Sequence, residues 1–204
     1  MGIQNQFLFQ NVIRETKVYS ADEANFEEII LENYEFKTRW PLETNFDYKQ
    51  PLPYGVIMNN ENKIFVYQRW WSKSAAAESR LHNKVSIGVG WHIEEEDIKE
   101  NNLLRDSLIR EVEEEIWVKE SDIKKITLIG YINYEENEVS RVHLGIWYVI
   151  QISESEIIMD DGELADGEFK TLEEYKEMIA SGKYDIEPWS LMLVPFIDTY
   201  INNF

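Results

Sequence analysis

The chain of 204 residues contains no cysteine. Disulfides, thiolate zinc sites and a cysteine nucleophile are therefore excluded, and the absence fits a reducing cytoplasm. No stretch approaches the roughly 20 apolar residues of a membrane span. Residues 1–10 also lack the cationic and apolar regions of a signal peptide. We therefore expect a cytoplasmic protein that has no membrane partner.

Basic residues are scarce in this chain. There are 20 Lys and Arg residues against 39 Asp and Glu residues, which gives a formal charge of −19. Such a field repels a phosphate polymer, so we expect no nucleic acid polymer as a partner. A small phosphorylated substrate is compatible with this charge, because bound divalent cations reverse the local sign. For most of the carboxylates, solubility is a sufficient explanation.

Glycine and proline are also few, with nine and five residues, whereas 44% of the chain is hydrophobic. This composition excludes wholesale disorder, and a chain of this length can bury a core. We expect residues 1–50 to form an N-terminal accessory segment with one short helix near residues 26–34. Prolines 41, 51 and 53 exclude a continuous helix after it. Residues 51–204 would form the main domain and include its C-terminal helices.

The main domain alternates between two hydrophobic periods. Runs of β-branched and aromatic residues bounded by turn residues predict strands, and apolar positions three and four residues apart predict helices. Because the two kinds of element interleave, we predict the α/β (α+β) class. The expected strands are residues 54–58, 63–69, 85–90, 125–134 and 143–152, and the expected helices are residues 103–118, 172–180 and 188–203.

The helix at residues 103–118 carries the strongest chemical signal. Glu111 aligns with Glu114 and Glu115 on one helical face, while Glu113 points elsewhere. Carboxylates packed together near a helix C-terminus repel one another and oppose the helix dipole. Either solvent screens this repulsion or a cation offsets it. Magnesium is such a cation, since it takes oxygen ligands from one or two carboxylates and from substrate phosphates.

The surrounding sequence resembles the Nudix box. The second half of the box is matched by Arg110-Glu111-Val112-Glu113-Glu114-Glu115-Ile116-Trp117-Val118, and the first half by Gly88-Val89-Gly90-Trp91-His92-Ile93-Glu94-Glu95-Glu96-Asp97. Residues 54–180 also have the family's order of strands, box, strand pair, acidic loop and helix. The resemblance implies a Nudix-like α/β/α sandwich around a mixed β-sheet.

Three features depart from the family pattern. Trp91 stands where a second glycine is expected. Trp117 replaces the glycine that ends the box helix, where a positive φ is often required. Thirteen residues rather than seven separate Glu96 from Arg110, which implies a longer loop before the helix. These departures bear on substrate fit and on catalytic rate, because Trp91 could crowd the diphosphate site.

The resemblance implies a metal site. Glu111, Glu114 and Glu115 would bind Mg²⁺, for which Mn²⁺ can substitute, and the carbonyl of Gly90 would be a further ligand. Arg110 would orient a box carboxylate through a salt bridge rather than contact the substrate.

The resemblance also implies further acidic positions. The early acidic position of the box would be Glu96 or Asp97. Residues 163–172 resemble the family's late loop, so Glu163 would bind metal or act as general base, unless it belongs to an ordinary acidic loop. Glu114 is the other candidate for the general base, and Glu138 is a weaker rival of Glu163.

Basic and aromatic side chains flank the expected cleft. Arg69, Arg80 and Lys84 could bind substrate phosphate, although sparse basic residues are more often simply on the surface. The pair Trp70-Trp71 could stack on a nucleobase, but we favour a role in the core or in a dimer interface. The three histidines, His82, His92 and His143, are too scattered along the sequence for a zinc site, and we expect His143 to be packed within its strand.

Taken together, these features predict a magnesium-dependent hydrolase that cleaves a diphosphate linkage in a nucleoside diphosphate derivative or a related metabolite. The alternative is a non-catalytic nucleotide-binding or regulatory protein on the same scaffold, which Trp91 and Trp117 would explain. An isopentenyl-diphosphate-isomerase-like reaction is disfavoured, because it usually demands a cysteine. A homodimer is among the states that the resemblance implies, and the sequence leaves the oligomeric state open.

Overall fold

The computed structural model describes residues 1–69, 83–98, 102–153, 157 and 164–202. The chain divides into two compact units. The first unit comprises Met1–Gly55, Gly90–Arg110 and Thr127–Tyr148, and the second comprises Val56–Val89, Glu111–Ile126 and Val149–Phe204. Several elements therefore have their two ends in different units.

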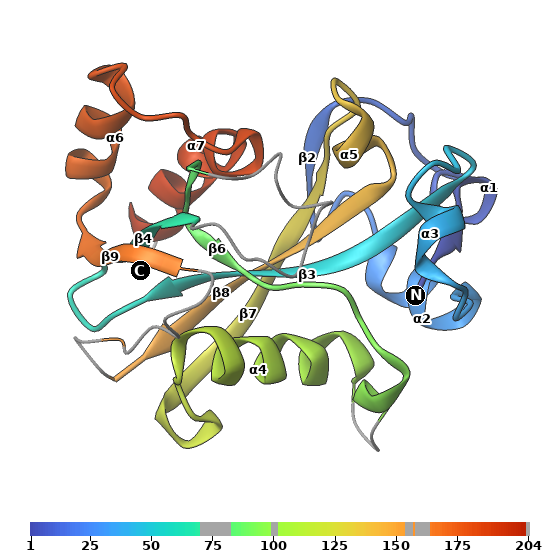
Figure 1. Ribbon diagram of the computed structural model, residues 1–204, viewed down its shortest axis with the longest axis horizontal. Coiled ribbons are helices and arrows are strands. Elements are labelled where there is room, and N and C mark those ends of the chain that lie inside the picture. The colour runs from blue at the N-terminus through green and yellow to red at the C-terminus, as the bar shows by residue number, and fades with distance from the viewer. Residues whose placement is uncertain (70–82, 99–101, 154–156, 158–163, 203–204) are drawn as a thin grey trace. The chain divides into compact units, whose positions relative to one another are not determined.

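The described residues form strands, α-helices and short 3₁₀ turns (Figure 1). The strands are β1 (Ile3–Gln4), β2 (Lys17–Ser20), β3 (Tyr48–Met58), β4 (Ile64–Arg69), β5 (Val85–Ser86), β6 (Gly88–Val89), β7 (Ile123–Asn133), β8 (His143–Ile152) and β9 (Leu164–Lys170). The α-helices are α1 (Asn5–Leu8), α2 (Phe26–Asn33), α3 (Arg39–Leu42), α4 (Leu103–Ile116), α5 (Glu138–Arg141), α6 (Leu172–Ala180) and α7 (Pro188–Asn202). The 3₁₀ turns include η2 (Glu95–Asp97) and η3 (Glu120–Asp122).

The strands hydrogen-bond in the order β2-β7-β8-β3-β4-β5, with β1 and β6 added to β3 and β9 added to β4. This mixed arrangement of strands and helices confirms the predicted α/β class. The helices expected at 103–118, 172–180 and 188–203 are α4, α6 and α7. Among the described residues, none of the helices combines the length and apolar character that a membrane span requires.

Strand β3 begins six residues earlier than expected, at Tyr48 rather than residue 54. Prolines 51 and 53 lie inside the strand, where the sequence suggested only an interruption. Backbone N–H groups alternate in direction along a strand, so both missing donors fall on the same edge. The opposite edge keeps its donors, and the backbone N–H of Gln50 donates to the carbonyl of Val142 at 2.6 Å.

The first unit is built around aromatic side chains. Strand β2 pairs with β7 in antiparallel register, from Lys17 opposite Asn133 to Ser20 opposite Gly130. The ring of Phe26 lies 5.3 Å from that of Tyr19 and 5.0 Å from that of Tyr131, so α2 packs on this strand pair. The segment 1–50, expected to be accessory, thus supplies strands β1 and β2 and the beginning of β3.

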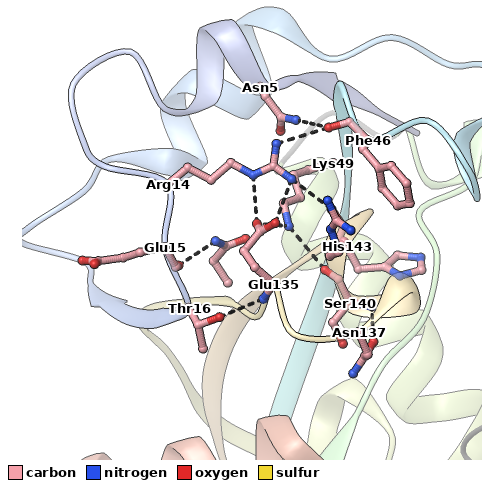
Figure 2. A network of polar contacts seen from close by, with 12 residues as sticks. Asn5, Arg14, Glu15, Thr16, Phe46, Lys49, Glu135, Asn137, Ser140 and His143 are labelled. Atoms are coloured by element: carbon pink, nitrogen blue, oxygen red, sulfur yellow. Dashed lines mark hydrogen bonds and ion pairs between the residues drawn. The ribbon is translucent and has the colours of Figure 1, made fainter.

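An ion-pair network, here called the Glu135 network, connects three parts of the first unit (Figure 2). Arg14 donates to both carboxylate oxygens of Glu135, at 2.9 and 2.8 Å. Lys49, whose side chain is completely buried, lies 2.8 Å from the same carboxylate and donates to the carbonyl of Ser140 at 3.3 Å. Burial alone would raise the pKa of Glu135, but Arg14 and Lys49 outweigh it and lower this pKa to about 2.

The second unit contains the pair β4 and β9 together with the two C-terminal helices. Phe65 pairs with Phe169 across these strands, and their rings lie 5.5 Å apart. A capping box starts α6, since the Thr171 hydroxyl accepts from the N–H of Glu174 and the Glu174 carboxylate accepts from the N–H of Thr171. Figure 1 shows β9 in orange leading into α6 and α7 in red.

Candidate functional site

Helix α4 begins after a firmly held turn in the first unit. The Asn102 side chain accepts hydrogen bonds from the N–H groups of Leu104 and Arg105, at 3.0 and 3.2 Å, and so caps the helix. In the preceding turn η2, the N–H of Glu94 donates to Asp97 at 2.9 Å. These side chains give hydrogen-bond partners to backbone N–H groups, which lack them in the first turn of a helix.

Arg110 forms a bidentate ion pair with Asp97. Its Nε and Nη2 atoms lie 2.6 and 2.9 Å from the two carboxylate oxygens, and Nη2 also donates to the carbonyl of His92 at 3.3 Å. Asp97 is only 2% exposed, and although burial raises its pKa, the Arg110 guanidinium holds that pKa below its ordinary value. Of the two residues that the sequence left open, Glu96 is exposed and Asp97 is the partner of Arg110.

The box glutamates follow on the part of α4 that belongs to the second unit. Glu111 and Glu115 are 5% and 8% exposed, and they lie one helical turn apart on a buried face. Glu113 and Glu114 are both exposed, and the Glu113 carboxylate accepts a hydrogen bond from the N–H of Glu120 at 3.0 Å. The structure therefore brings Glu111 and Glu115 together and leaves Glu114 at the edge of this pair.

Trp117 ends the box helix in a left-handed conformation. Helix α4 stops at Ile116, and Trp117 has φ of 53° with a side chain that is 62% exposed. The other non-glycine residues with positive φ in the described part of the chain are three Asn or Asp residues, which tolerate this region better than a bulky side chain does. The backbone thus keeps the conformation expected of the family's glycine, although the residue is tryptophan.

Gly90 occupies a position that only glycine can fill. Its φ is 146°, and a Cβ atom placed there would lie 1.9 Å from the carbonyl oxygen of Pro53. The next residue, Trp91, is half-buried, with the guanidinium carbon of Arg39 at 5.5 Å from its ring. These contacts lie within the first unit, and metal binding by the Gly90 carbonyl stays a prediction.

Two of the predicted phosphate-binding residues lie side by side in the second unit. The backbone N–H of Arg69 donates to the carbonyl of Lys84 at 2.9 Å. The Lys84 side chain forms an ion pair with Asp185 at 2.6 Å, whereas the Arg69 guanidinium lies 5.6 Å from the ring centre of Tyr67. Burial raises the pKa of Tyr67, Arg69 lowers it and Glu115 raises it, so Arg69 and Glu115 both act on this tyrosine. Arg80, Glu163, His82 and the pair Trp70-Trp71 lie outside the described residues.

The sequence did not indicate a buried carboxylate near the start of α7. Glu187 accepts hydrogen bonds from the hydroxyls of Ser86 at 2.6 Å and Ser190 at 3.1 Å. These hydroxyls in turn accept from the backbone N–H groups of Gly88 and Ile87. The one available signal was the position of Glu187 directly before Pro188, which is typical of a helix start. This cluster fixes the strand segment that leads to Gly90.

Two of the three histidines, which are far apart in the sequence, lie close together in the fold. The ring centres of His92 and His143 lie 5.2 Å apart, and Glu43 lies beside them in the first unit. Sequence spacing could not show this, because the fold unites positions about fifty residues apart. His143 is also packed and hydrogen-bonded, as expected, with Nδ1 at 2.7 Å from the carbonyl of Val139.

Comparison with known proteins gives both a relative and a fold. No family model matches the chain. Protein YmaB of Bacillus subtilis (strain 168) is 32% identical over 187 residues, which are 89% of this chain and 87% of that protein. The crystal structure of Tm1382, which is described as a candidate Nudix hydrolase, superposes on this chain with a TM-score of 0.75 at 23% identity. The superposition covers 100% of this chain and 98% of Tm1382.

A second solved structure supports the same fold. The Nudix domain of Shewanella oneidensis NrtR, in complex with ADP ribose, has a TM-score of 0.56 at 14% identity and covers 86% of this chain and 98% of that one. These structural likenesses agree with the box read from the sequence. The chain therefore belongs to the family of protein YmaB, and its fold is the Nudix fold.

Proposed function

We propose that the protein is a magnesium-dependent hydrolase that cleaves a diphosphate linkage in a nucleoside diphosphate derivative. The observation that carries this proposal is the pair Glu111 and Glu115, buried one turn apart on α4. Two carboxylates on one helical face present oxygen ligands of the kind that Mg²⁺ takes from proteins. The Nudix fold is consistent with this chemistry.

The donor set fits magnesium rather than a softer metal. Glu111, Glu114 and Glu115 offer only carboxylate oxygens, which are the ligands that Mg²⁺ prefers. When bound, the metal would neutralise diphosphate charge and lower the pKa of a coordinated water. Glu111 and Glu115 would hold it from the buried face, and Glu114 would reach it from the exposed edge.

The remaining residues would position the reaction. Arg110 is engaged by Asp97, so it would orient the turn before the helix rather than bind substrate. The exposed Glu114 carboxylate would accept the proton of the attacking water as general base, and Glu163 is the rival for that role. Arg69 would contact a substrate phosphate as a charged donor. Arg80 and Lys84 are secondary candidates, and Asp185 already pairs with Lys84.

The test is release of phosphate or nucleotide from a panel of diphosphates with Mg²⁺ or Mn²⁺. ADP-ribose belongs in the panel because the NrtR domain binds it. We expect Glu115→Gln and Glu114→Gln to lower the rate at least about 100-fold, as the loss of a charge-stabilising group does. Glu113→Gln is the matched control and should retain the wild-type rate. Equal release by the wild type, Glu114→Gln and Glu115→Gln would defeat the proposal.

A non-catalytic nucleotide-binding protein is the second candidate, and its support is that Trp91 and Trp117 stand where the family pattern has glycine. Calorimetry with ADP-ribose separates the two functions, since binding without product release would support the second. A cytoplasmic location and a homodimer stay predictions from the sequence.

A further inference from the structure

Three side chains of types that can ligate metals meet in the first unit, at a place that the proposed hydrolysis does not use. One ligand atom each from Glu43, His92 and His143 lies within 4.8 Å of the other two. Glu43 follows the short helix α3, His92 lies in the segment before η2, and His143 begins β8. Here the three residues are called the His–Glu cluster.

Hydrogen bonds fix the orientation of His143. Its Nδ1 atom lies 2.7 Å from the carbonyl oxygen of Val139, and a carbonyl can only accept, so this nitrogen carries the proton. The lone pair of the neutral ring is therefore on Nε2, which accepts a hydrogen bond from the side-chain amide of Gln50 at 3.3 Å, and a metal would replace that amide. A histidine that donates one N–H to a backbone carbonyl and keeps the other nitrogen for a metal is the usual arrangement in metal sites.

The spacing between His92 and Glu43 is too long for a hydrogen bond and suits an ion. The Nε2 atom of His92 lies 3.9 Å from Oε1 of Glu43. In a tetrahedral site with metal–ligand distances of roughly 2.0–2.1 Å, ligand atoms lie about 3.3 Å apart. Since the three ligand atoms lie within 4.8 Å of one another, their separations would need to shorten by at most about 1.5 Å to reach metal-binding geometry.

The surrounding charges are mixed. Arg39 donates to the same Glu43 oxygen at 3.0 Å, and its side chain is 43% exposed, so it can stay as an outer partner of the carboxylate. Arg39 and Lys49 both lower the pKa of His143, and Glu43 raises it. Glu43 is thus the carboxylate among the charges that act on His143, and Arg39 and the Met1 ammonium lower the pKa of His92.

We propose that Glu43, His92 and His143 bind a transition metal of the zinc class, at a site separate from the magnesium carboxylates of α4. Two imidazoles and one carboxylate are a recurrent zinc ligand set, and imidazole nitrogen favours zinc over magnesium. Water would complete the coordination. Because the His92 carbonyl accepts from Arg110, the metal would steady the turn from which Arg110 and Asp97 orient the box helix.

The test is cobalt(II) titration of the full chain, produced without a histidine tag and stripped of metal by chelator. A four-coordinate cobalt site gives intense visible bands, and we expect about one equivalent to bind in excess Mg²⁺ and to be displaced by Zn²⁺. Glu43→Gln and His92→Ala should weaken cobalt binding at least about 100-fold, since even outer-shell changes cost 10–100-fold. His143→Gln would repeat the test from β8.

The controls keep this test independent of the proposed hydrolysis. His82→Ala removes the chain's remaining histidine, and Glu115→Gln removes a box carboxylate, so both should leave the visible bands unchanged. Circular dichroism establishes that each variant is folded. Bands typical of six-coordinate cobalt, bands that persist in folded Glu43→Gln and His92→Ala, or bands lost in His82→Ala would overturn the proposal.

Discussion

The first unit buries Asp97 and Glu135 against arginine and lysine, whereas the second unit buries Glu111 and Glu115 on one face of one helix. Asp97 has the bidentate guanidinium of Arg110 at 2.6 and 2.9 Å. Glu135 has Arg14 and Lys49 at 2.8 Å each. The first two carboxylates are thus held by residues far away in the sequence, whereas the second two lie one turn apart on the same helix.

On the proposed function, this difference distinguishes carboxylates with a structural role from those that would bind a cation. Asp97 and Glu135, which are paired with arginine or lysine, stabilise the fold at neutral pH. Two carboxylates one turn apart reduce stability by their mutual repulsion, and a divalent ion would relieve it. The comparison predicts that changes in the first group alter stability, whereas changes in the second group alter metal response and activity.

The largest effect on stability is expected at Glu135. Glu135→Gln would leave the completely buried Lys49 ammonium without its carboxylate partner, and burial already lowers the pKa of Lys49 to about 8. Breaking a buried pair costs about 3 kcal/mol or more, and partial exposure reduces this to about 2–3 kcal/mol here. Urea unfolding at neutral pH measures the loss. Glu136→Gln, an exposed neighbour, should change the free energy of unfolding by less than about 0.5 kcal/mol, and an equal loss in both variants would contradict the assignment.

Acid should weaken the Glu135 network next. Because the folded pKa of Glu135 is about 2 and its ordinary value is 4.5, the stabilisation is fully present above pH 4.5 and is lost as the pH falls toward 2. After allowance for solvent screening, this contribution is about 1–2 kcal/mol. Unfolding curves of the wild type and Glu135→Gln should converge across this range. Parallel curves would show that Glu135 does not titrate with the fold.

Magnesium should stabilise the folded protein by binding to Glu111 and Glu115. At about tenfold excess over its dissociation constant, a ligand that binds only the folded state adds about 1.4 kcal/mol. Glu115→Gln should remove this gain, whereas Glu135→Gln should retain it despite its lower baseline. The urea midpoint with and without Mg²⁺ measures both. A gain that survives in Glu115→Gln would break the contrast between the two carboxylate groups.

The smallest effect concerns the end of α4. Trp117 holds φ of 53°, which is strained for a bulky residue, so Trp117→Gly should stabilise the protein by about 1 kcal/mol. Trp117→Ala keeps the strained backbone and should show no such gain. Thermal unfolding of the two variants provides the comparison, and identical melting temperatures would mean that the tryptophan side chain compensates for the strain.

The sequence predicted the fold best where a single periodicity dominates. Helix α4 and its Glu-rich face followed from apolar spacing, and the positive φ at Trp117 followed from the glycine expected there. The beginning of β3 did not, because proline was read as an interruption although alternate prolines can share one edge of a strand.

The contacts that the sequence could not supply are long-range. Nothing local links Arg14 to Glu135, which is 121 positions away, or Ser86 to Glu187, which is 101 positions away. The His–Glu cluster depends in the same way on three separate segments of the first unit. Helical spacing placed Glu111, Glu114 and Glu115 on one face. The structure shows that Glu114 is exposed, whereas Glu111 and Glu115 are buried.

The central claim is that carboxylates of α4 bind divalent ions against a diphosphate. Crystals grown with Mn²⁺ and ADP-ribose test it directly, because manganese gives an anomalous signal at its own position. The account predicts an anomalous peak beside Glu111 and Glu115. A map with ADP-ribose bound but no peak beside these side chains would contradict it.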